Sequence, residues 1–296
     1  MKVLLVFNPM AAHKRAGKLL PEIEAGFSKL NISFDLRLTD YPEHAVDIVR
    51  EAEFDSYDGI AVAGGDGTLF ESINGYYQNQ SKRKIPIGVL PVGTGNAFAR
   101  DLELQTFQWK EALEIIQKNK PRKVDAGYFT THGQKYYFLN IMGLGFVADV
   151  TKTAHKLKLI GNISYTIGVL YQTIFLRSFK LQMEADGKTI EKESVFVEIS
   201  NTRYTSNFLM APNAEIDDGL LDVTILSRLN RRRLLQCFPK IFTGEHLEMD
   251  EIEQFKAKKI VIETDKPKVI TPDGELVGIS PVTVECLHQD VPVFWK

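Results

Sequence analysis

Cysteine is scarce in this chain. Cys237 and Cys286 are the only two among 296 residues, and they stand far apart. That count argues against a disulfide scaffold and against a zinc site built from closely spaced cysteines, so we expect both thiols to be reduced. The histidines lack the spacing of a zinc protease, and no apolar run reaches the roughly 18 residues of a membrane span. With a net charge of −2, the chain has no overall basic field for nucleic acid.

Two familiar nucleotide motifs are also missing. No Gly-x4-Gly-Lys-Ser/Thr sequence occurs, which argues against a P-loop kinase, and no Gly-x-Gly-x-x-Gly follows the first apolar strand, which argues against a dehydrogenase. What remains is a chain that is 44% hydrophobic and 25% charged. This composition is typical of a globular protein with one large or two medium domains.

The most informative stretch is a glycine-rich turn. The apolar run 60–63 predicts a buried parallel strand, and Leu69, Ile73 and Tyr76 recur afterwards at helical spacing. Glycines let a backbone approach a ligand closely, and the first N–H groups of a helix attract an anion. The strand, turn and helix therefore predict a phosphate-binding turn formed by Gly64, Gly65, Asp66, Gly67 and Thr68.

A second turn of the same kind follows about 30 residues later. The apolar strand 87–90 leads into Gly93, Thr94, Gly95 and Asn96, and then a helix begins. In an open α/β sheet, two such turns at neighbouring strand ends suit one ligand that lies across both.

Asp66 has two readings. A carboxylate beside phosphates is repelled unless a cation lies between them, so we expect Asp66 to reach Mg²⁺ or the acceptor hydroxyl beside a nucleotide triphosphate. The alternative is an ordinary helix cap without a ligand.

Together, Gly64–Thr68 and residues 90–100, Leu-Pro-Val-Gly-Thr-Gly-Asn-Ala-Phe-Ala-Arg, resemble the diacylglycerol kinase catalytic domain, which bacterial soluble lipid kinases and sphingosine kinases share. The resemblance implies an ATP- and Mg²⁺-dependent lipid kinase. It also implies that Asn8, in an Asn-Pro pair after the first strand, and Thr39, after the second, contact the nucleotide. Thr39 is equally suited to cap the helix that follows it.

Two domains are expected. Residues 1–120 predict a doubly wound, Rossmann-like α/β domain. Beyond them, many short strands separated by turns, including an Asp186-Gly187 hairpin, predict a mainly-β sandwich domain over 121–290 that binds the lipid. A helical insertion is expected at 143–179, with an apolar face that includes Leu159 and Ile160 and either holds lipid or forms core. Residues 291–296 are expected to return to the first domain.

Two acidic turns complete the expected site. In the family that the chain resembles, the segment matching 211–222 holds a structural Mg²⁺, which implies Asp218 as a side-chain ligand and Glu215 and Leu220 as carbonyl ligands; a plain turn is the alternative. The Asp-Gly-Glu sequence at 273–275 carries the catalytic acids of that family. This implies Glu275 as the base for the acceptor hydroxyl, helped by Asp273 across the cleft, whereas Asp-Gly alone indicates a hairpin turn.

The expected substrate is a lipid alcohol such as diacylglycerol, met at the membrane surface by a cytoplasmic, peripherally associated enzyme. Basic groups near the helical insertion and at 231–233 favour anionic headgroups. Three alternatives stay open: a sphingoid-base kinase, an NAD kinase-like enzyme, and a non-catalytic lipid-binding regulator. The sequence also leaves open whether the chain forms a homodimer.

Overall fold

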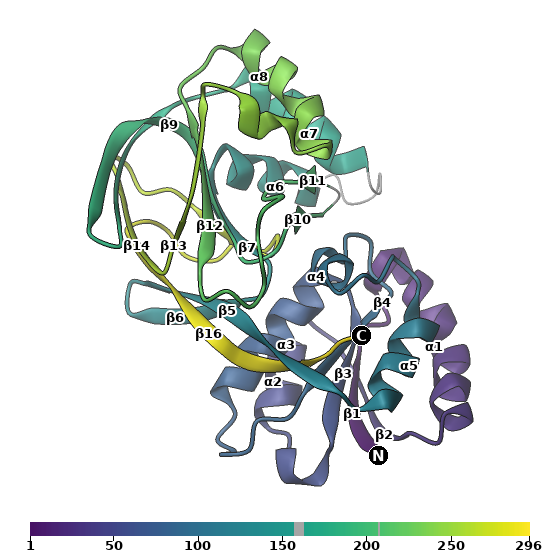
Figure 1. Cartoon of the computed structure of the whole chain (residues 1–296). Helices are drawn as coiled ribbons and strands as arrows, with labels where there is room; N and C mark the ends of the chain where they lie inside the picture. Colours follow the sequence, from purple (N-terminus) through teal and green to yellow (C-terminus); the bar gives the residue numbers. More distant parts are fainter. Residues whose placement is uncertain (157–162, 207) are drawn as a thin grey trace. The chain divides into compact units, whose positions relative to one another are not determined.

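The computed structural model describes residues 1–156, 163–206 and 208–296, and the chain divides into two compact units (Figure 1). Unit 1 comprises Met1–Asp125 and Gln289–Lys296, and unit 2 comprises Ala126–His288. The chain enters unit 2 along strand β5 (Pro121–Thr131) and leaves it along strand β16 (Val282–Phe294). Within unit 1, Val293 of β16 pairs in parallel with Ile87.

Unit 1 is an alternation of strands and helices. Its elements are β1 (Lys2–Phe7), α1 (Ala11–Lys29), β2 (Ser33–Leu38), α2 (His44–Arg50), the short 3₁₀ helix η1 (Phe54–Ser56), β3 (Gly59–Gly64), α3 (Asp66–Gln78), β4 (Ile87–Pro91), α4 (Ala97–Asp101) and α5 (Trp109–Lys118).

The strands of unit 1 form a parallel sheet in the order β2-β1-β3-β4. All residues of β3 and β4 are buried, as expected for strands covered on both faces. Helices α2 and α3 pack together and contact β1 and β3, while α1 and α5 pack together and contact β2, β3 and β4. The strand order reverses between β1 and β3, which is where sheets of this kind bind their ligands. The predicted doubly wound domain is confirmed.

Unit 2 consists mainly of strands. Its elements are β6 (Gln134–Phe138), β7 (Ile141–Gly145), α6 (Phe146–Lys156), α7 (Ile163–Ile174), β8 (Phe179–Ala185), β9 (Lys188–Ser200), β10 (Tyr204–Thr205), β11 (Phe208–Leu209), β12 (Leu221–Ser227), α8 (Arg231–Cys237), the 3₁₀ helices η3 (Phe238–Phe242) and η4 (Glu245–Glu248), β13 (Ile252–Ala257), β14 (Lys259–Thr264) and β15 (Ile270–Pro272).

The long strand β9 organises unit 2. Its first half pairs with β8, which in turn pairs with β14, and its second half pairs with β7 on one side and β12 on the other. The predicted Asp186-Gly187 turn joins β8 and β9 as a two-residue hairpin, and both of its residues have positive φ, as this turn requires. The predicted β-rich second domain is therefore confirmed.

The helical insertion is shorter than the sequence predicts. Gly143 and Gly145 lie in β7, because this strand fills the place between β9 and β15, and Phe179 already belongs to β8. Among the described residues of the predicted 143–179, only α6 and α7 are helical, and the predicted face residues Leu159 and Ile160 lie outside the described residues. Helices α6 and α7 pack against each other.

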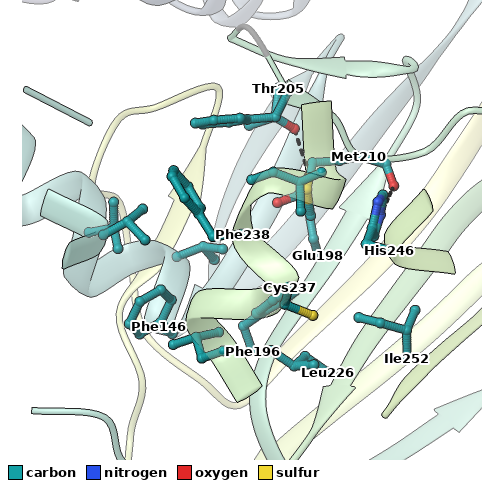
Figure 2. Close-up of a pocket in the computed structure, with 16 residues that line it drawn as sticks. Phe146, Phe196, Glu198, Thr205, Met210, Leu226, Cys237, Phe238, His246 and Ile252 are labelled. Carbon is teal, nitrogen blue, oxygen red and sulfur yellow. Dashed lines mark hydrogen bonds between the residues drawn. The ribbon is translucent and has the colours of Figure 1, made fainter. Parts of the chain in front are cut away.

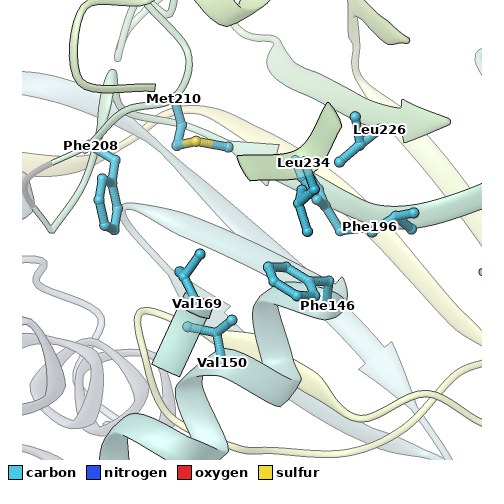
Figure 3. Packing of buried hydrophobic residues seen from close by; sticks show 9 residues of the cluster. Phe146, Val150, Val169, Phe196, Phe208, Met210, Leu226 and Leu234 are labelled. Atoms are coloured by element: carbon cyan, nitrogen blue, oxygen red, sulfur yellow. The ribbon is translucent and has the colours of Figure 1, made fainter. Parts of the chain in front are cut away.

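A buried apolar cluster lies between these helices and the sheet of unit 2 (Figure 3). It comprises Phe146, Val150, Val169, Val195, Phe196, Phe208, Met210, Leu226 and Leu234. In the part of the chain that the structure describes, each helix is too short or too polar to cross a bilayer.

Candidate active site

The carboxyl ends of the four parallel strands bring the predicted nucleotide residues to one edge of unit 1. Phe7 of β1 is in register with Leu38 of β2 and with Ala63 of β3, and Gly64 is in register with Pro91 of β4. The residues that follow these strands, from Asn8 to the second glycine turn, therefore lie along a single edge of the sheet.

The two glycine turns touch each other through their main chains. A Cβ atom on Gly93 would lie 2.3 Å from the Cα atom of Gly65, and one on Gly64 would lie 2.5 Å from the side chain of Thr68. Neither position has room for a side chain. Gly67 and Thr68 form the first turn of α3, whose leading N–H groups have no partner within the helix.

Asp66 joins the two turns. Its Oδ1 atom accepts a hydrogen bond of 2.7 Å from the backbone N–H of Ala97, the first residue of α4. Burial raises the pKa of Asp66 to about 6, and the N–H groups of Ala97, Phe98 and Asn96 oppose that rise. The cap of its own helix is Gly65, so Asp66 serves the start of α4 rather than of α3.

Asn96 and Asn8 brace these turns. The buried Asn96, at a positive φ of 53°, accepts a hydrogen bond from the Gly93 N–H and donates to the Gly93 carbonyl. Asn8 donates from Nδ2 to the hydroxyl of Thr68 at 3.0 Å. Thr39 is buried and extends the β1–β2 pairing by donating its N–H to Phe7. The alternative that Thr39 caps the next helix is wrong, since the cap of α2 is Glu43.

The turn after β1 has an unusual backbone. Ala12, His13 and Lys14 have φ angles of 48°, 58° and 69°, a left-handed conformation that costs about 1–3 kcal/mol per non-glycine residue. Regular helix starts only after them. Strain of this kind is often found at functional sites, and this turn follows the carboxyl end of β1, at the sheet edge that carries the predicted nucleotide residues.

The two acids of the Asp-Gly-Glu turn in unit 2 are held differently. The buried Asp273 accepts backbone hydrogen bonds from Asn140 and Ile141 on Oδ1, and a longer one of 3.4 Å from Leu139 on Oδ2. Glu275 is half-buried, and its N–H closes the turn onto the Pro272 carbonyl at 2.7 Å. Within the described segments, no hydrogen bond or ion pair holds its carboxylate. Asp273 is thus anchored, whereas Glu275 is available for a substrate.

The predicted metal ligands lie in the turn before β12. The Oδ1 atom of Asp218 accepts from the Leu220 N–H at 2.9 Å, and its Oδ2 atom lies 2.5 Å from the ammonium of Lys256. Glu215 is exposed, and no group of three acidic, histidine or cysteine side chains among the described residues is arranged to hold a metal ion. Lys256 supplies the positive charge here, so this turn as it stands does not fit a metal ion. The Mg²⁺ set of Glu215, Asp218 and Leu220 stays a prediction.

Sequence reasoning missed one feature of unit 2, a cavity with a buried acid (Figure 2). Its walls are almost entirely apolar and include Phe146, Phe196 and Phe238, but Glu198 also lines it. The volume of the cavity is about 70 Å³. A glutamate inside the apolar run 195–199 is the signal that could have revealed the buried acid, but not the cavity around it.

Comparisons with known proteins agree with this architecture. The family model described as the diacylglycerol kinase catalytic domain matches residues 2–129, and that of the YegS C-terminal NAD kinase beta sandwich-like domain matches residues 140–295. The chain is 27% identical over 292 residues to the diacylglycerol kinase of Bacillus subtilis (strain 168), covering 98% of this chain and 94% of the relative. It is 27% identical over 342 residues to sphingosine kinase 1 of Arabidopsis thaliana, covering 96% of this chain and 70% of that protein.

A solved structure is similar over the full length. The crystal structure of a diacylglycerol kinase from Bacillus anthracis str. Sterne matches with a TM-score of 0.76 and 26% identity, covering 100% of this chain and 97% of that one.

Proposed function

Because the chain belongs to the family that joins a diacylglycerol kinase catalytic domain to a YegS-type β-sandwich domain, and is therefore a lipid kinase, we propose that it transfers the γ-phosphoryl group of ATP to the hydroxyl of diacylglycerol. A sphingoid base is the second candidate acceptor, since sphingosine kinase 1 is similar over most of this chain.

The observation that carries the proposal is the contact between Gly65 and Gly93. Two main chains without side chains meet where β3 and β4 end, and helix α3 starts beside them with free N–H groups. A triphosphate carries its charge on oxygens that accept from such groups. Asn8, Thr39, Thr94 and Gly95 lie along the same edge and complete the proposed ATP site, in which Asn96 acts by bracing the second turn.

Asp66 is the residue that would hold Mg²⁺. The raised pKa reflects a carboxylate removed from water without a full counter-charge, which suits a divalent cation. When bound, Mg²⁺ would offset the charge on the phosphate oxygens. Asp66 itself also keeps the start of α4 against the first turn through the Ala97 N–H.

Glu275 is the proposed base. In the transfer, the acceptor oxygen forms a bond to the γ-phosphorus, the bond from that phosphorus to ADP breaks, and the hydroxyl proton passes to a carboxylate. The Glu275 carboxylate has no competing partner among the described residues, and the turn that presents it is closed by its own N–H. Asp273 acts indirectly, since its oxygens fix the start of β7.

The cavity of unit 2 is the proposed place for a lipid chain. It is bounded by α6, α7, α8 and the strands β9 and β12, and its narrow apolar bore suits an alkyl chain. Burial of each methylene group there is worth about 0.8 kcal/mol.

An exposed apolar face on α7 supports a membrane-associated role for the enzyme. Leu170, Tyr171, Ile174 and Phe175 are each about half exposed, at 49%, 51%, 61% and 51%. The nearby helix α8 contacts α7 and adds exposed Arg231 and Arg232. Apolar side chains flanked by cations favour an anionic lipid surface. Arg233 is occupied instead by a two-pronged ion pair with Glu251.

The proposal is tested with purified protein, labelled ATP and a panel of dioctanoylglycerol, sphinganine and NAD. We expect label in the lipid products only, and Asp66→Ala should lower kcat by at least ~100-fold because the charge on the transferring phosphoryl group is no longer offset. Asp55→Ala, at an exposed position of η1, serves as the control for the loss of a carboxylate. Labelled NAD would favour an NAD kinase-like enzyme, and ATP binding without any turnover would favour a non-catalytic regulator.

A further inference from the structure

Glu198 is a carboxylic acid in a cavity whose other walls are almost entirely apolar. It is 1% exposed and stands near the end of β9, beside Phe196 on the same face of the strand. Figure 2 shows it among apolar side chains, with a single dashed contact to Thr205, whose hydroxyl donates to Oε1 at 2.6 Å. A carboxyl group in such surroundings is costly unless a polar or charged partner meets it.

The protein does not supply a cation for it. Among the described residues no lysine, arginine or histidine forms an ion pair with Glu198, and burial raises its pKa to about 7. The two other titratable groups that line the cavity stay neutral, because burial lowers the pKa of His246 and raises the pKa of the Cys237 thiol. His246 is also bound through Nε2 to the Met210 carbonyl.

Strand register connects Glu198 to the Asp-Gly-Glu turn. Glu198 of β9 is opposite Gly143 of β7, and Gly143 is opposite Thr271 of β15. Residues opposite one another across neighbouring strands point to the same face, so Glu198 and Thr271 share one face about two strand spacings, or roughly 10 Å, apart. The buried hydroxyl of Thr271 has no hydrogen-bond partner within the described residues. Glu275 follows four residues later.

We propose that Glu198 selects the acceptor lipid: besides the hydroxyl that receives the phosphoryl group, the chain in the cavity carries a second hydrogen-bond donor, a hydroxyl or a protonated amine, in contact with the Glu198 carboxyl. This rests on the proposed lipid kinase function and, of its two candidate acceptors, favours the sphingoid base, because diacylglycerol has no donor besides its acceptor hydroxyl. A donor in the lipid gives the buried acid of the cavity a further partner besides the hydroxyls of Thr205 and Ser200, whereas a plain chain adds none. The unpartnered hydroxyl of Thr271 lies on this face toward the Asp-Gly-Glu turn, while Val147 packs over Gly143 between Thr271 and Glu198.

The test uses the full-length protein and four dodecan-1-ols that differ only at carbon 2, which bears an amine, a hydroxyl, a methoxy or a methyl group. Their binding is measured at pH 8 by displacement of the fluorescent probe 1-anilinonaphthalene-8-sulfonate. We expect the wild-type protein to bind the amine and the diol at least tenfold more tightly than the methoxy and methyl compounds. Glu198→Leu should bind all four within threefold of one another, with the methyl compound bound no more weakly than by wild type.

Two further variants sharpen the result. Glu198→Gln keeps an acceptor oxygen but no charge, so it should retain a preference for the diol and lose the preference for the amine. Glu191→Leu, at an exposed position on the same strand, should leave all four affinities unchanged. Equal affinities in the wild-type protein, or a preference that persists in Glu198→Leu, would overturn the proposal, and so would tighter binding of the methoxy compound than of the diol.

The same four alcohols are then offered with labelled ATP, which separates the two proposals. A donor preference in binding without any transfer of phosphate would contradict the kinase function and leave the role of Glu198 intact. Transfer to all four alcohols with equal kcat/KM would support the kinase and overturn the selection by Glu198.

Discussion

The two glycine turns of unit 1 are held by main chain against main chain, whereas two of the Asp-Gly turns of unit 2, at 218–219 and 273–274, are held by carboxylates. Gly93 and Gly65 meet without side chains between them. Asp273 instead accepts from backbone N–H groups of Leu139, Asn140 and Ile141, and Asp218 pairs with Lys256.

This difference shows why similar sequence patterns carry different chemistry. A turn fixed by close backbone approach leaves its N–H groups to face a ligand, so its purpose can be read from the glycines. A turn fixed by its own acid uses up that acid. In the Asp-Gly-Glu turn, Asp273 accepts backbone hydrogen bonds, whereas the Glu275 carboxylate has no partner among the described residues. The two roles depend on groups far away in the sequence and not on the turn itself.

The largest expected effect separates the two acids of the Asp-Gly-Glu turn. Glu275→Gln should lower kcat by at least ~100-fold with an unchanged melting temperature, because it removes a proton acceptor and breaks no contact of the described residues. Asp273→Asn should instead lower the free energy of unfolding by about 1–3 kcal/mol, since an amide placed against backbone N–H groups loses acceptor capacity. Steady-state kinetics and thermal melts measure the two quantities.

Glu263→Gln, on an exposed position of β14, is the matched control for charge removal in unit 2. If Glu275→Gln retained full activity, the base would have to be another residue, and the contrast between the two acids would be lost.

The next effect concerns the contact between the glycine turns. Gly93→Ala should destabilise the protein by about 2 kcal/mol and weaken ATP binding by at least tenfold, because the new Cβ atom would lie 2.3 Å from Gly65. Gly65→Ala is the control for stability, since its Cβ atom would be 3.4 Å from the Cα atom of Gly93, and it should cost less than about 1 kcal/mol. Chemical denaturation and nucleotide titration provide the measurements, and equal losses in both variants would argue against the close contact.

The smallest effect tests whether Lys256 stands in for a metal ion. Lys256→Met should cost about 1 kcal/mol, because Asp218 and Asp222 lose a shared, partly solvent-exposed partner that lies 2.5 Å and 3.8 Å away. Millimolar Mg²⁺ without nucleotide should restore part of that loss, whereas EDTA should leave the wild-type melting temperature unchanged. Lys259→Met removes a more exposed pair with Glu285 and should change little. A rise in the wild-type melting temperature on adding Mg²⁺ would support the predicted metal ligands instead.

The fold could be predicted largely from the sequence where backbone geometry dictates residue type. Apolar runs ending in glycine predicted β3 and β4 with their turns, and Asp186-Gly187 predicted the β8–β9 hairpin. The predicted end of the helical insertion, Phe179, was wrong. Phe179 is the first residue of β8, and a single apolar residue at that position fits a helical pattern as well as an alternating strand.

Features that depend on distant partners could not be predicted. Lys256 is 38 residues from Asp218, and the N–H groups that hold Asp273 are more than 130 residues from it. Glu198 stands in a strand that reads as buried core, and nothing nearby in the sequence indicates the cavity around it. The cavity is formed by several elements that are distant in the sequence, so the local sequence pattern around any one of them does not predict it.

The bond from Asp66 to Ala97 makes the two glycine turns interdependent. If the Gly-Gly-Asp turn alone were grafted onto another parallel sheet, its aspartate would lose the backbone N–H that it accepts from. The second turn of that sheet would in turn lack the bond that holds its helix start. By the same reasoning, a mutation that moves the start of α4 should also alter the first turn, because it displaces the Ala97 N–H that Asp66 accepts from. The smallest unit that can be transferred to another protein is therefore both glycine turns together with α4, whose first N–H group Asp66 accepts from.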